Sequence, residues 1–289
     1  MGSNPIPGAK FYELRLNSVL FHLKSLDNDL FYFHVVTFRV VHMTYRRSAK
    51  FYDLFGSKND LEFYRELAFQ SGKKALELGV GTGRVAIPLA KAGMTVVGID
   101  NSVHMLRVAR EKLARETDAV RRRIILKKGD MRHFELKQSF PFIYVPSSTF
   151  DHNITIEEQK RTLNCVYKHL EANGTFAFDL EQAMLNKPDT SWWIDRKEIE
   201  RGRMVVRSIF SRRDMTKHMC SLDLFFDVYK YGKLLERLHE YGEVAMISKD
   251  EVTKLLEEEG FKVESIYGDF NKSKYRNDSK RIVLVTRKK

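Results

Sequence analysis

The spacing of apolar and polar residues changes several times along the chain, and each change predicts an element. From Lys74 onward, short apolar runs alternate with segments whose apolar residues recur at helical spacing. The apolar runs predict strands at 74–78, 94–99, 124–128, 142–145 and 175–179. The segments between them predict helices at 84–92, after the cap Ser102, and at 156–170. Strands and helices that alternate in this way form parallel β-α-β units, so we expect a doubly wound α/β sheet.

The chain before this alternation is harder to interpret. The first segment has no clear period: the apolar residues within 11–23 fit one face of a helix, and 30–41 fits either a strand or a buried helix. Residues 45–70 then show helical spacing in two halves. Asn59 or Asp60 is placed to cap the second half.

The chain after the fifth predicted strand changes period again. Residues 203–247 alternate as several strands and predict a β-rich excursion. A capping box at 248–251 begins a helix that ends at Gly260, and 261–267 and 281–285 predict two closing strands. Together with the five earlier strands, they predict a mostly parallel, seven-stranded, Rossmann-like sheet.

These patterns divide the chain into four segments. Residues 1–44 are an N-terminal leader whose role as a lid, an interface or an extension of the core is left open. Residues 45–180 form the core, 181–247 the β-rich excursion, and 248–289 the C-terminal helix and closing strands of the core.

The composition fits an intracellular globular protein. The chain has 289 residues, of which 43% are hydrophobic, so it has enough apolar material for a sizeable core. Cys165 and Cys220 supply neither a disulfide framework nor a metal-ligand set, so we predict a reducing, cytoplasmic compartment and no metal. The most apolar stretch, 30–43, is interrupted by charged residues and is too short to span a bilayer.

The formal net charge of +12 indicates contact with an anionic partner. Nucleic acid is one such partner, but the basic runs at 121–123 and 287–289 are short. We therefore keep nucleic-acid binding as an alternative that is not favoured. The oligomeric state is left open.

Three successive predicted strands end in residues suited to an adenosine-bearing ligand. The first is followed by Gly79, Gly81 and Gly83, which let the backbone turn tightly and approach a ligand without a Cβ. The second ends at Asp100, which is placed to accept both hydroxyls of a ribose. The third is followed by 129–131, where an acid can accept an adenine amino group. The glycine spacing differs from the dinucleotide fingerprint, which seats a pyrophosphate.

These segments resemble the signatures of the class I methyltransferases that use S-adenosylmethionine (SAM). Residues 76–90, LELGVGTGRVAIPLA, look like the nucleotide-binding signature of that superfamily, and 98–106, GIDNSVHML, and 129–131 look like its second and third signatures. The resemblance extends over 45–180. It is closest to the small-molecule N-methyltransferase branch, which includes glycine- and amino-sugar-type enzymes and has a β-rich excursion at the same place.

The resemblance implies SAM as cofactor and S-adenosylhomocysteine as product. It implies that the glycine turn, oriented by Glu77, passes the methionine part of SAM and that Asp100 binds the ribose. Tyr52 and Arg84 would lie near the carboxylate end. By this resemblance the cofactor-binding residues are Tyr52, Glu77, Gly79, Gly81, Gly83, Arg84, Asp100, Asn101, Met105, Gly129, Asp130, Met131 and Pro146.

One feature of the fourth predicted strand departs from the family. Members often carry an acid early in this strand, whereas this chain has Pro141 there. The chain also lacks the Asn/Asp-Pro-Pro-Tyr/Phe motif of many nucleic-acid and glutamine N-methyltransferases. The absence of this motif argues against methylation of a base amino group.

The candidate catalytic residues follow the fourth strand. Asp151 and His152 lie just past its end, and His152 is the better base on intrinsic chemistry. A structural role at the start of the next helix is the alternative for both residues. A base is needed only if the acceptor arrives protonated.

The candidate acceptor-contacting residues are aromatic. Phe150 ends the segment where the methyl group would lie, and Tyr45 is placed to close over the cofactor. Trp192 and Trp193 lie where a lid over the acceptor is expected, and aromatic faces hold cationic amines well. Core packing is the alternative for the two tryptophans.

The functional interpretations that remain are of different classes. We favour a SAM-dependent methyltransferase acting on nitrogen or oxygen of a small-molecule acceptor. An RNA or protein methyltransferase is the alternative that the net charge supports. A SAM-binding protein without turnover is the alternative that Pro141 and the lack of an unambiguous base support.

Overall fold

The computed structural model describes residues 10–16, 19–26, 29–33, 45–182, 185 and 188–289 of the chain. Contacts between Cα atoms divide the chain into two compact units, 1–40 and 41–289. In the part of the chain described, no helix is both long enough and apolar enough to cross a bilayer.

The first unit contains an antiparallel sheet of the order β1-β2-β3 within its described residues. Its strands are β1 (Lys10–Leu16), β2 (Val19–Leu26) and β3 (Asp29–Phe33). The helical interpretation of 11–23 is therefore wrong, because backbone pairing between neighbouring strands overrides a weak helical spacing. The first residues of 30–41 are the strand β3, and the rest of that range lies outside the described residues.

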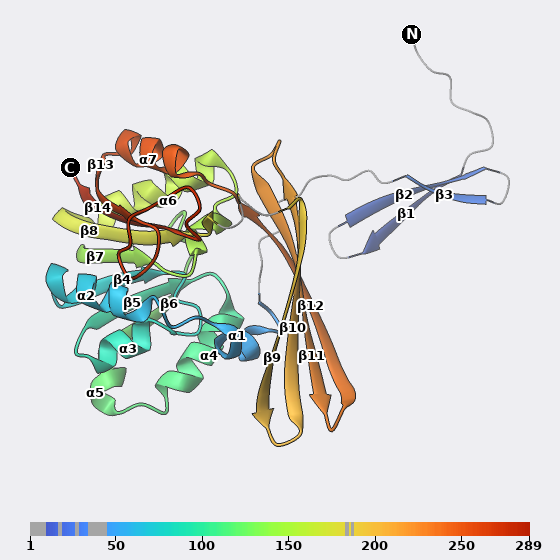
Figure 1. Cartoon of the computed structure of the whole chain (residues 1–289), viewed down its shortest axis with the longest axis horizontal. Helices are drawn as coiled ribbons and strands as arrows, with labels where there is room; N and C mark the ends of the chain where they lie inside the picture. Colours follow the sequence, from blue (N-terminus) through green and yellow to red (C-terminus); the bar gives the residue numbers. More distant parts are fainter. Residues whose placement is uncertain (1–9, 17–18, 27–28, 34–44, 183–184, 186–187) are drawn as a thin grey trace, which may run out of the picture. The chain divides into compact units, whose positions relative to one another are not determined.

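The second unit is built on a mixed sheet with the strand order β13-β14-β8-β7-β4-β5-β6 (Figure 1). Its strands are β4 (Lys74–Leu78), β5 (Thr95–Asp100), β6 (Ile124–Lys128), β7 (Phe140–Val145), β8 (Leu170–Leu180), β13 (Phe261–Tyr267) and β14 (Ile282–Lys288). Strands β4 to β8 run parallel, and β14 runs antiparallel to both of its neighbours. Over the residues described, the predicted seven-stranded doubly wound sheet is confirmed.

Helices cover both faces of this sheet. They are α2 (Leu61–Ser71), α3 (Ala86–Lys91), α4 (Val103–Leu113), α5 (Asp118–Arg121), α6 (Ile156–His169) and α7 (Lys249–Glu258). Apolar residues of α6 and α7 pack on one face, and those of α2, α3 and α4 pack on the other. Successive side chains of a strand point to opposite faces of its sheet. In β7, Ile143 and Val145 therefore pack with α6 and α7, whereas Phe142 and Tyr144 pack with α2, α3 and α4.

Local capping explains where several helices begin. The Ser102 side chain accepts a hydrogen bond from the Met105 N–H, and Ser248 forms the predicted capping box with Glu251. Asp60 is the N-cap residue of α2, one of the two positions predicted, but its side chain makes no capping hydrogen bond because its carboxylate is paired with Arg84.

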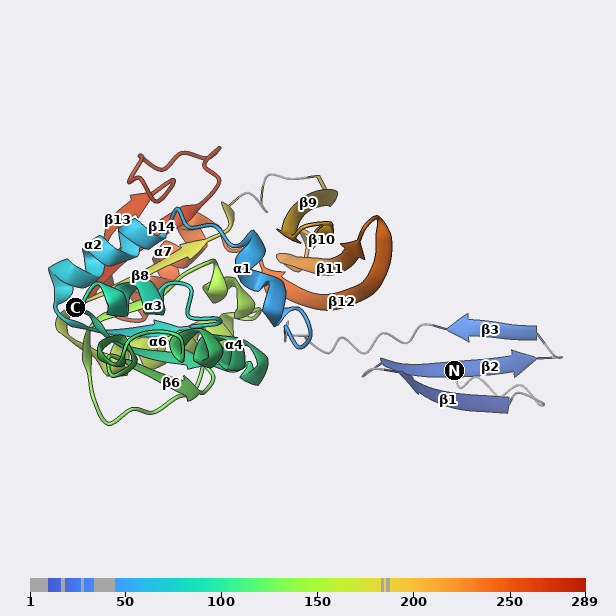
Figure 2. The ribbon, with the colours of Figure 1, turned by 90° about the horizontal axis from the view of Figure 1, so that it is seen from below.

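The excursion after β8 is a second, antiparallel sheet with the order β12-β11-β10-β9 (Figures 1 and 2). Its strands are β9 (Thr190–Glu200), β10 (Arg203–Asp214), β11 (Met219–Lys230) and β12 (Lys233–Ala245). The sequence patterns did not predict β9. This edge strand is largely exposed, so it lacks the alternation that marks a half-buried strand.

The antiparallel sheet packs against two short helical segments, η1 (Ala49–Phe51) and α1 (Tyr52–Phe55). Phe51 and Phe226 form the stacked centre of this contact, with ring centroids 6.0 Å apart. Glu240 of β12 accepts hydrogen bonds from the backbone N–H groups of Arg47 and Ser48 and from the Ser48 hydroxyl. The sheet therefore holds in place the segment that carries Tyr45 and Tyr52.

Candidate active site

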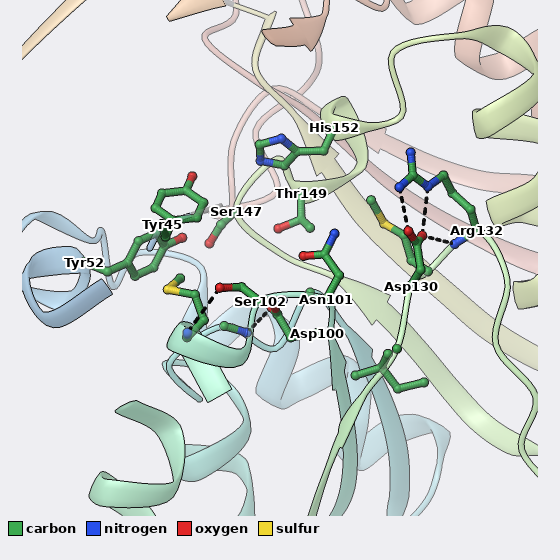
Figure 3. Close-up of a pocket in the computed structure, with 16 residues that line it drawn as sticks. Tyr45, Tyr52, Asp100, Asn101, Ser102, Asp130, Arg132, Ser147, Thr149 and His152 are labelled. Atoms are coloured by element: carbon green, nitrogen blue, oxygen red, sulfur yellow. Dashed lines mark hydrogen bonds and ion pairs between the residues drawn. The ribbon is translucent and has the colours of Figure 1, made fainter. Parts of the chain in front are cut away.

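A pocket lies at the carboxyl ends of β4, β5 and β6 (Figure 3). The chain runs from β4 outward to β6 and returns to β7 on the other side of β4, so the pocket borders the topological switch point of the sheet. Ligands of open α/β sheets bind at such points. We call it the glycine-turn pocket; it is lined by Tyr45, Tyr52, Gly79, Gly81, Ile99, Asp100, Asn101, Ser102, Met105, Gly129, Asp130, Met131, Arg132, Ser147, Thr149 and His152.

The glycine turn after β4 has no room for a larger residue at its first position. Gly79 has a φ of +70°, and a Cβ built on it would lie 2.3 Å from Cγ2 of Thr149. Gly81 has a φ of +55°. Gly83 lies outside the pocket lining, and its Cβ would meet Ile87, so packing at the start of α3 explains this glycine.

Asp100 connects the glycine turn to the start of α4. Its Oδ2 accepts the N–H of Gly81 at 2.7 Å, and its Oδ1 accepts the N–H of Ser102 at 2.7 Å. Burial raises the pKa of Asp100, and these two backbone donors oppose that shift. One carboxylate therefore fixes the shape of two of the loops that line the pocket (Figure 3).

Asp130 is bound by a neighbour that the sequence analysis missed. Both of its carboxylate oxygens accept hydrogen bonds from Arg132 (Figure 3). The Arg132 guanidinium also pairs with Glu158. Burial acts to raise the pKa of Asp130, but the hydrogen bonds from Arg132 outweigh it and lower the pKa. Asp130 therefore lies at the pocket with its carboxylate already paired.

Glu77 is buried below the glycine turn. The Tyr144 hydroxyl donates to its Oε2 at 2.6 Å. Burial raises the pKa of Glu77 to about 8, against the opposing hydrogen bond from Tyr144. Glu77 lies behind the turn and lines a small hollow with Pro146 rather than the glycine-turn pocket.

We expect the substitution Glu77→Gln to flatten the pH dependence of stability. The folded-state pKa of about 8 exceeds the ordinary value of 4.5, so the folded protein holds a proton that the unfolded chain releases. The resulting stabilisation is complete below pH 4.5 and is lost as the pH rises through 8, at a slope of at most about 1.4 kcal/mol per pH unit. Urea unfolding at pH 5, 6.5 and 8 measures the slope. Equal slopes in both proteins would contradict the assignment.

Arg84, which follows the glycine turn, links this turn to the segment before α2 and to the turn after β7. Its guanidinium donates to Asp60 at 2.6 Å, to the carbonyl of Ser57 at 2.6 Å and to the Ser147 hydroxyl. It lines a second pocket and not the glycine-turn pocket. The predicted position of Arg84 near a ligand carboxylate is thus replaced by a fixed ion pair with Asp60.

The second pocket lies between the strand ends of the core and the inner face of the antiparallel sheet. We call it the sheet-side pocket; it is lined by Tyr45, Phe51, Tyr52, Phe55, Gly56, Ser57, Asp60, Arg84, Ser147, Ser148, Asp151, His152, Glu181, Arg207, Ile209, Leu222, Leu224, Phe226, Val244, Phe270 and Arg281. Tyr45, Tyr52, Ser147 and His152 line both pockets. These residues therefore mark a junction at which two bound molecules would meet.

The turn after β7 brings Ser147 and His152 to the junction. Ser147 and Ser148 have φ values of 62° and 53°, a left-handed conformation that is strained for residues with a Cβ. Buried Asp179 holds the turn, since its Oδ2 accepts the N–H and the hydroxyl of Ser148. Arg281 donates to the same oxygen at 2.6 Å. Strained backbone that the surrounding contacts maintain is typical of functional sites.

The two candidate catalytic residues differ in their surroundings. His152 ends the short helix η2 (Thr149–His152) and points into the junction beside Thr149 and Asn101 (Figure 3). Asp151 is buried, and its Oδ2 accepts the N–H of Glu181 at 3.1 Å. Burial raises the pKa of Asp151 well above its usual range. The surroundings of Asp151 therefore disfavour its charged form.

Three aromatic residues predicted to contact the acceptor line neither pocket. Phe150 is fully buried in the core, with its ring centroid 4.8 Å from that of Phe178. Trp192 and Trp193 lie on the edge strand β9 with 56% and 60% of their surface exposed. Their predicted position over the acceptor is wrong, because the polar segment around them is a strand of the sheet and not a lid.

Five further lining residues of the glycine-turn pocket were not among the predicted site residues: Ile99, Ser102, Arg132, Ser147 and Thr149. Ser102 was recognised only as a helix cap. The polar run after β7 was a usable signal for Ser147 and Thr149. Among the residues that the structure describes, no group of His, Cys, Asp and Glu side chains is arranged to hold a metal ion.

Comparison with known proteins identifies the same region. Residues 75–174 match the family model described as a methyltransferase domain. A protein of Geobacillus sp. (strain WCH70) named as a methyltransferase is 25% identical over 258 residues, covering 85% of this chain and 100% of that protein.

Two solved structures share the fold over most of the chain. The CcbJ methyltransferase from Streptomyces caelestis matches with a TM-score of 0.72 and 22% identity, covering 85% of this chain and 98% of that one. The SAM-bound amino pentose methyltransferase CalS10 from Micromonospora echinaspora matches with a TM-score of 0.66 and 18% identity, covering 84% and 96%.

Proposed function

We propose that this chain, whose residues 75–174 match a methyltransferase domain and whose fold is shared with SAM-dependent methyltransferases, transfers the methyl group of SAM to a nitrogen or oxygen atom of a small-molecule acceptor. The observation that carries the proposal is the junction, where Tyr45, Tyr52, Ser147 and His152 line both pockets. Methyl transfer needs a donor and an acceptor held end to end, and pockets that share a wall provide that arrangement.

The glycine-turn pocket fits SAM. Gly79 packs so closely on Thr149 that a Cβ would clash there, so glycine sets the shape of the turn that lines the pocket. The carboxylate of Asp100 suits a ribose, while Met105 and Met131 offer apolar contacts for an adenine. When bound, SAM supplies a methyl group already activated by its sulfonium. The protein's task is then mainly to align the acceptor and exclude water.

The chain's own contribution at the junction is proton removal and positioning. We assign His152 as the base that takes a proton from an acceptor that arrives protonated, since histidine is the residue type suited to this role near neutral pH. Tyr45 and Tyr52, whose rings meet edge to face with centroids 5.5 Å apart, form the opposite wall. Asp151 then acts as a structural support for Glu181.

Incubation with methyl-labelled SAM and separate pools of small amines, phenols and bulk RNA tests the proposal. We expect label in the amine or phenol pool and none in RNA. With the accepting compound, His152→Ala should lower kcat by about 100-fold, the usual range for a lost general base, and leave the affinity for SAM within twofold.

The control is His218→Ala, which removes an exposed histidine that lines neither pocket. This variant should retain wild-type kcat. Label in RNA alone would favour the nucleic-acid alternative. Binding of SAM without transfer to any pool would favour a binding protein without turnover.

A further inference from the structure

The wall that the antiparallel sheet contributes to the sheet-side pocket is almost entirely apolar. The cavity has a volume of about 290 Å³. Its apolar lining comes from β10 to β12 and from η1 and α1: Phe51, Phe55, Ile209, Leu222, Leu224, Phe226 and Val244. A cavity of this size and lining suits a ring-sized apolar group.

The charged residues of this pocket are already paired. Arg84 binds Asp60 at 2.6 Å. Arg281 binds Asp179 at 2.6 Å and also pairs with Glu181 at 3.2 Å. Three acids face two arginines on the core side of the pocket, so this side offers no excess positive charge to attract an anionic acceptor.

The arginine that the sheet contributes is paired as well. Arg207 donates to Asp195 at 2.6 Å, and its guanidinium lies over the Phe55 ring at 4.6 Å from the centroid. Burial raises the pKa of Asp151 and so disfavours a negative charge on its carboxyl. A phosphate or a second carboxylate on the acceptor would therefore lose its hydration here without gaining an unpaired cation.

Polar groups line the junction and the core side of the pocket rather than the sheet wall. The side chains of Ser147 and His152 border both pockets, whereas Ile209, Leu222 and Phe226 border the sheet-side pocket alone. The pocket is thus polar on the core side, where the methyl group would arrive, and mainly apolar on the sheet wall.

We propose that the acceptor has an uncharged, ring-sized apolar body that packs on the sheet wall at Ile209, Leu222 and Phe226, with its nucleophilic nitrogen or oxygen at His152. This inference rests on the proposed function and names the class of acceptor. It excludes from this pocket acceptors whose bodies are small and hydrophilic or carry phosphate groups.

The test uses three amines with the same aminoethyl nucleophile and different bodies: 2-phenylethylamine, ethanolamine and O-phosphoethanolamine. Each is titrated by calorimetry into the full-length protein loaded with S-adenosylhomocysteine, and into the protein alone. We expect 2-phenylethylamine to bind at least about tenfold more tightly than the others, a difference of about 1.4 kcal/mol, because burial of the phenyl group on the sheet wall is favourable. Equal binding, or tighter binding of either polar amine, overturns the proposal.

Ile209→Asp places a charge on the apolar wall, and Leu222→Asn is a milder variant. Ile194→Asp is the matched control, because Ile194 is 60% exposed on β9 and lines neither pocket. Both pocket variants should weaken 2-phenylethylamine by about tenfold and leave S-adenosylhomocysteine affinity within twofold, while the control changes neither. Unchanged amine binding in both pocket variants overturns the proposal.

The same titrations distinguish a failure of the proposed function from a failure of this inference about the acceptor. If S-adenosylhomocysteine does not bind the wild-type protein, the cofactor assignment fails. The amine series on the protein alone then still tests the apolar wall, because that wall does not include the glycine-turn residues.

Discussion

Gly79→Ala is expected to lower the affinity for SAM by about 100-fold, or about 2.8 kcal/mol. The new Cβ would lie 2.3 Å from Cγ2 of Thr149, and the φ of +70° is unfavourable for alanine. The turn or Thr149 must therefore move, and both line the pocket that we assign to SAM. Calorimetric titration with SAM and with S-adenosylhomocysteine measures the loss.

Two further variants separate the steric effect from the conformational one. Gly93→Ala is the control for conformation alone, because Gly93 has a φ of +106° and no atom near its Cβ position. It should lower stability by about 1–2 kcal/mol and leave SAM affinity within twofold. Adding Thr149→Ser to Gly79→Ala removes the clashing methyl group and should recover part of the affinity. Wild-type affinity in Gly79→Ala would show that SAM does not pass this turn.

The core sheet could be predicted from the sequence because its central strands are buried and its edge strands still carry apolar residues. The buried strand 74–78 and the partly exposed edge strands 124–128 and 261–267 were predicted with the bounds that the structure has. A strand covered by helices on both faces is an apolar run, and such runs are visible without knowledge of tertiary contacts. Strand β9 was missed for the opposite reason, since an exposed edge strand shows no such pattern.

The glycine turn and the strand-end acids were also predictable, because parallel strands bring their carboxyl ends to one edge of a sheet. Gly79, Gly81, Asp100 and Asp130 all line one pocket. Their hydrogen-bond partners were not predictable. Arg132 binds Asp130 through a local turn whose side-chain geometry the sequence does not specify.

The supports of the site depend on contacts between distant parts of the chain. Asp179 binds the Tyr64 hydroxyl at 2.8 Å, 115 residues away, and holds the strained turn at Ser148. The ion pair of Asp60 with Arg84 diverted Asp60 from the capping role that its sequence position suggested. Such pairings are set by the folded arrangement and not by local spacing.

Asp100→Ala is expected to lower the affinity for SAM by about 100-fold. The carboxylate accepts the N–H groups of Gly81 and Ser102, each at 2.7 Å, and hydrogen bonds to a charged group are worth about 1.5–3 kcal/mol each. Without it, the glycine turn and the start of α4 lose their common acceptor, and the ribose loses the acid that we assign to it. Titration with SAM measures the effect.

The conservative variant and a neighbouring acid make this prediction specific. Asp100→Asn keeps the shape but turns an amide N–H₂ toward one of the two backbone donors, so we expect a loss of about tenfold. Asp53→Ala removes an acid that supports the same turn from outside the pocket by accepting the Thr82 hydroxyl at 2.6 Å. It should cost less than about threefold, because its bonds to the Thr82 hydroxyl and to the partly exposed ammonium of Lys112 lie outside the pocket. If Asp53→Ala weakened SAM as much as Asp100→Ala, turn support alone would account for both results, and the assignment of Asp100 to the ribose would be wrong.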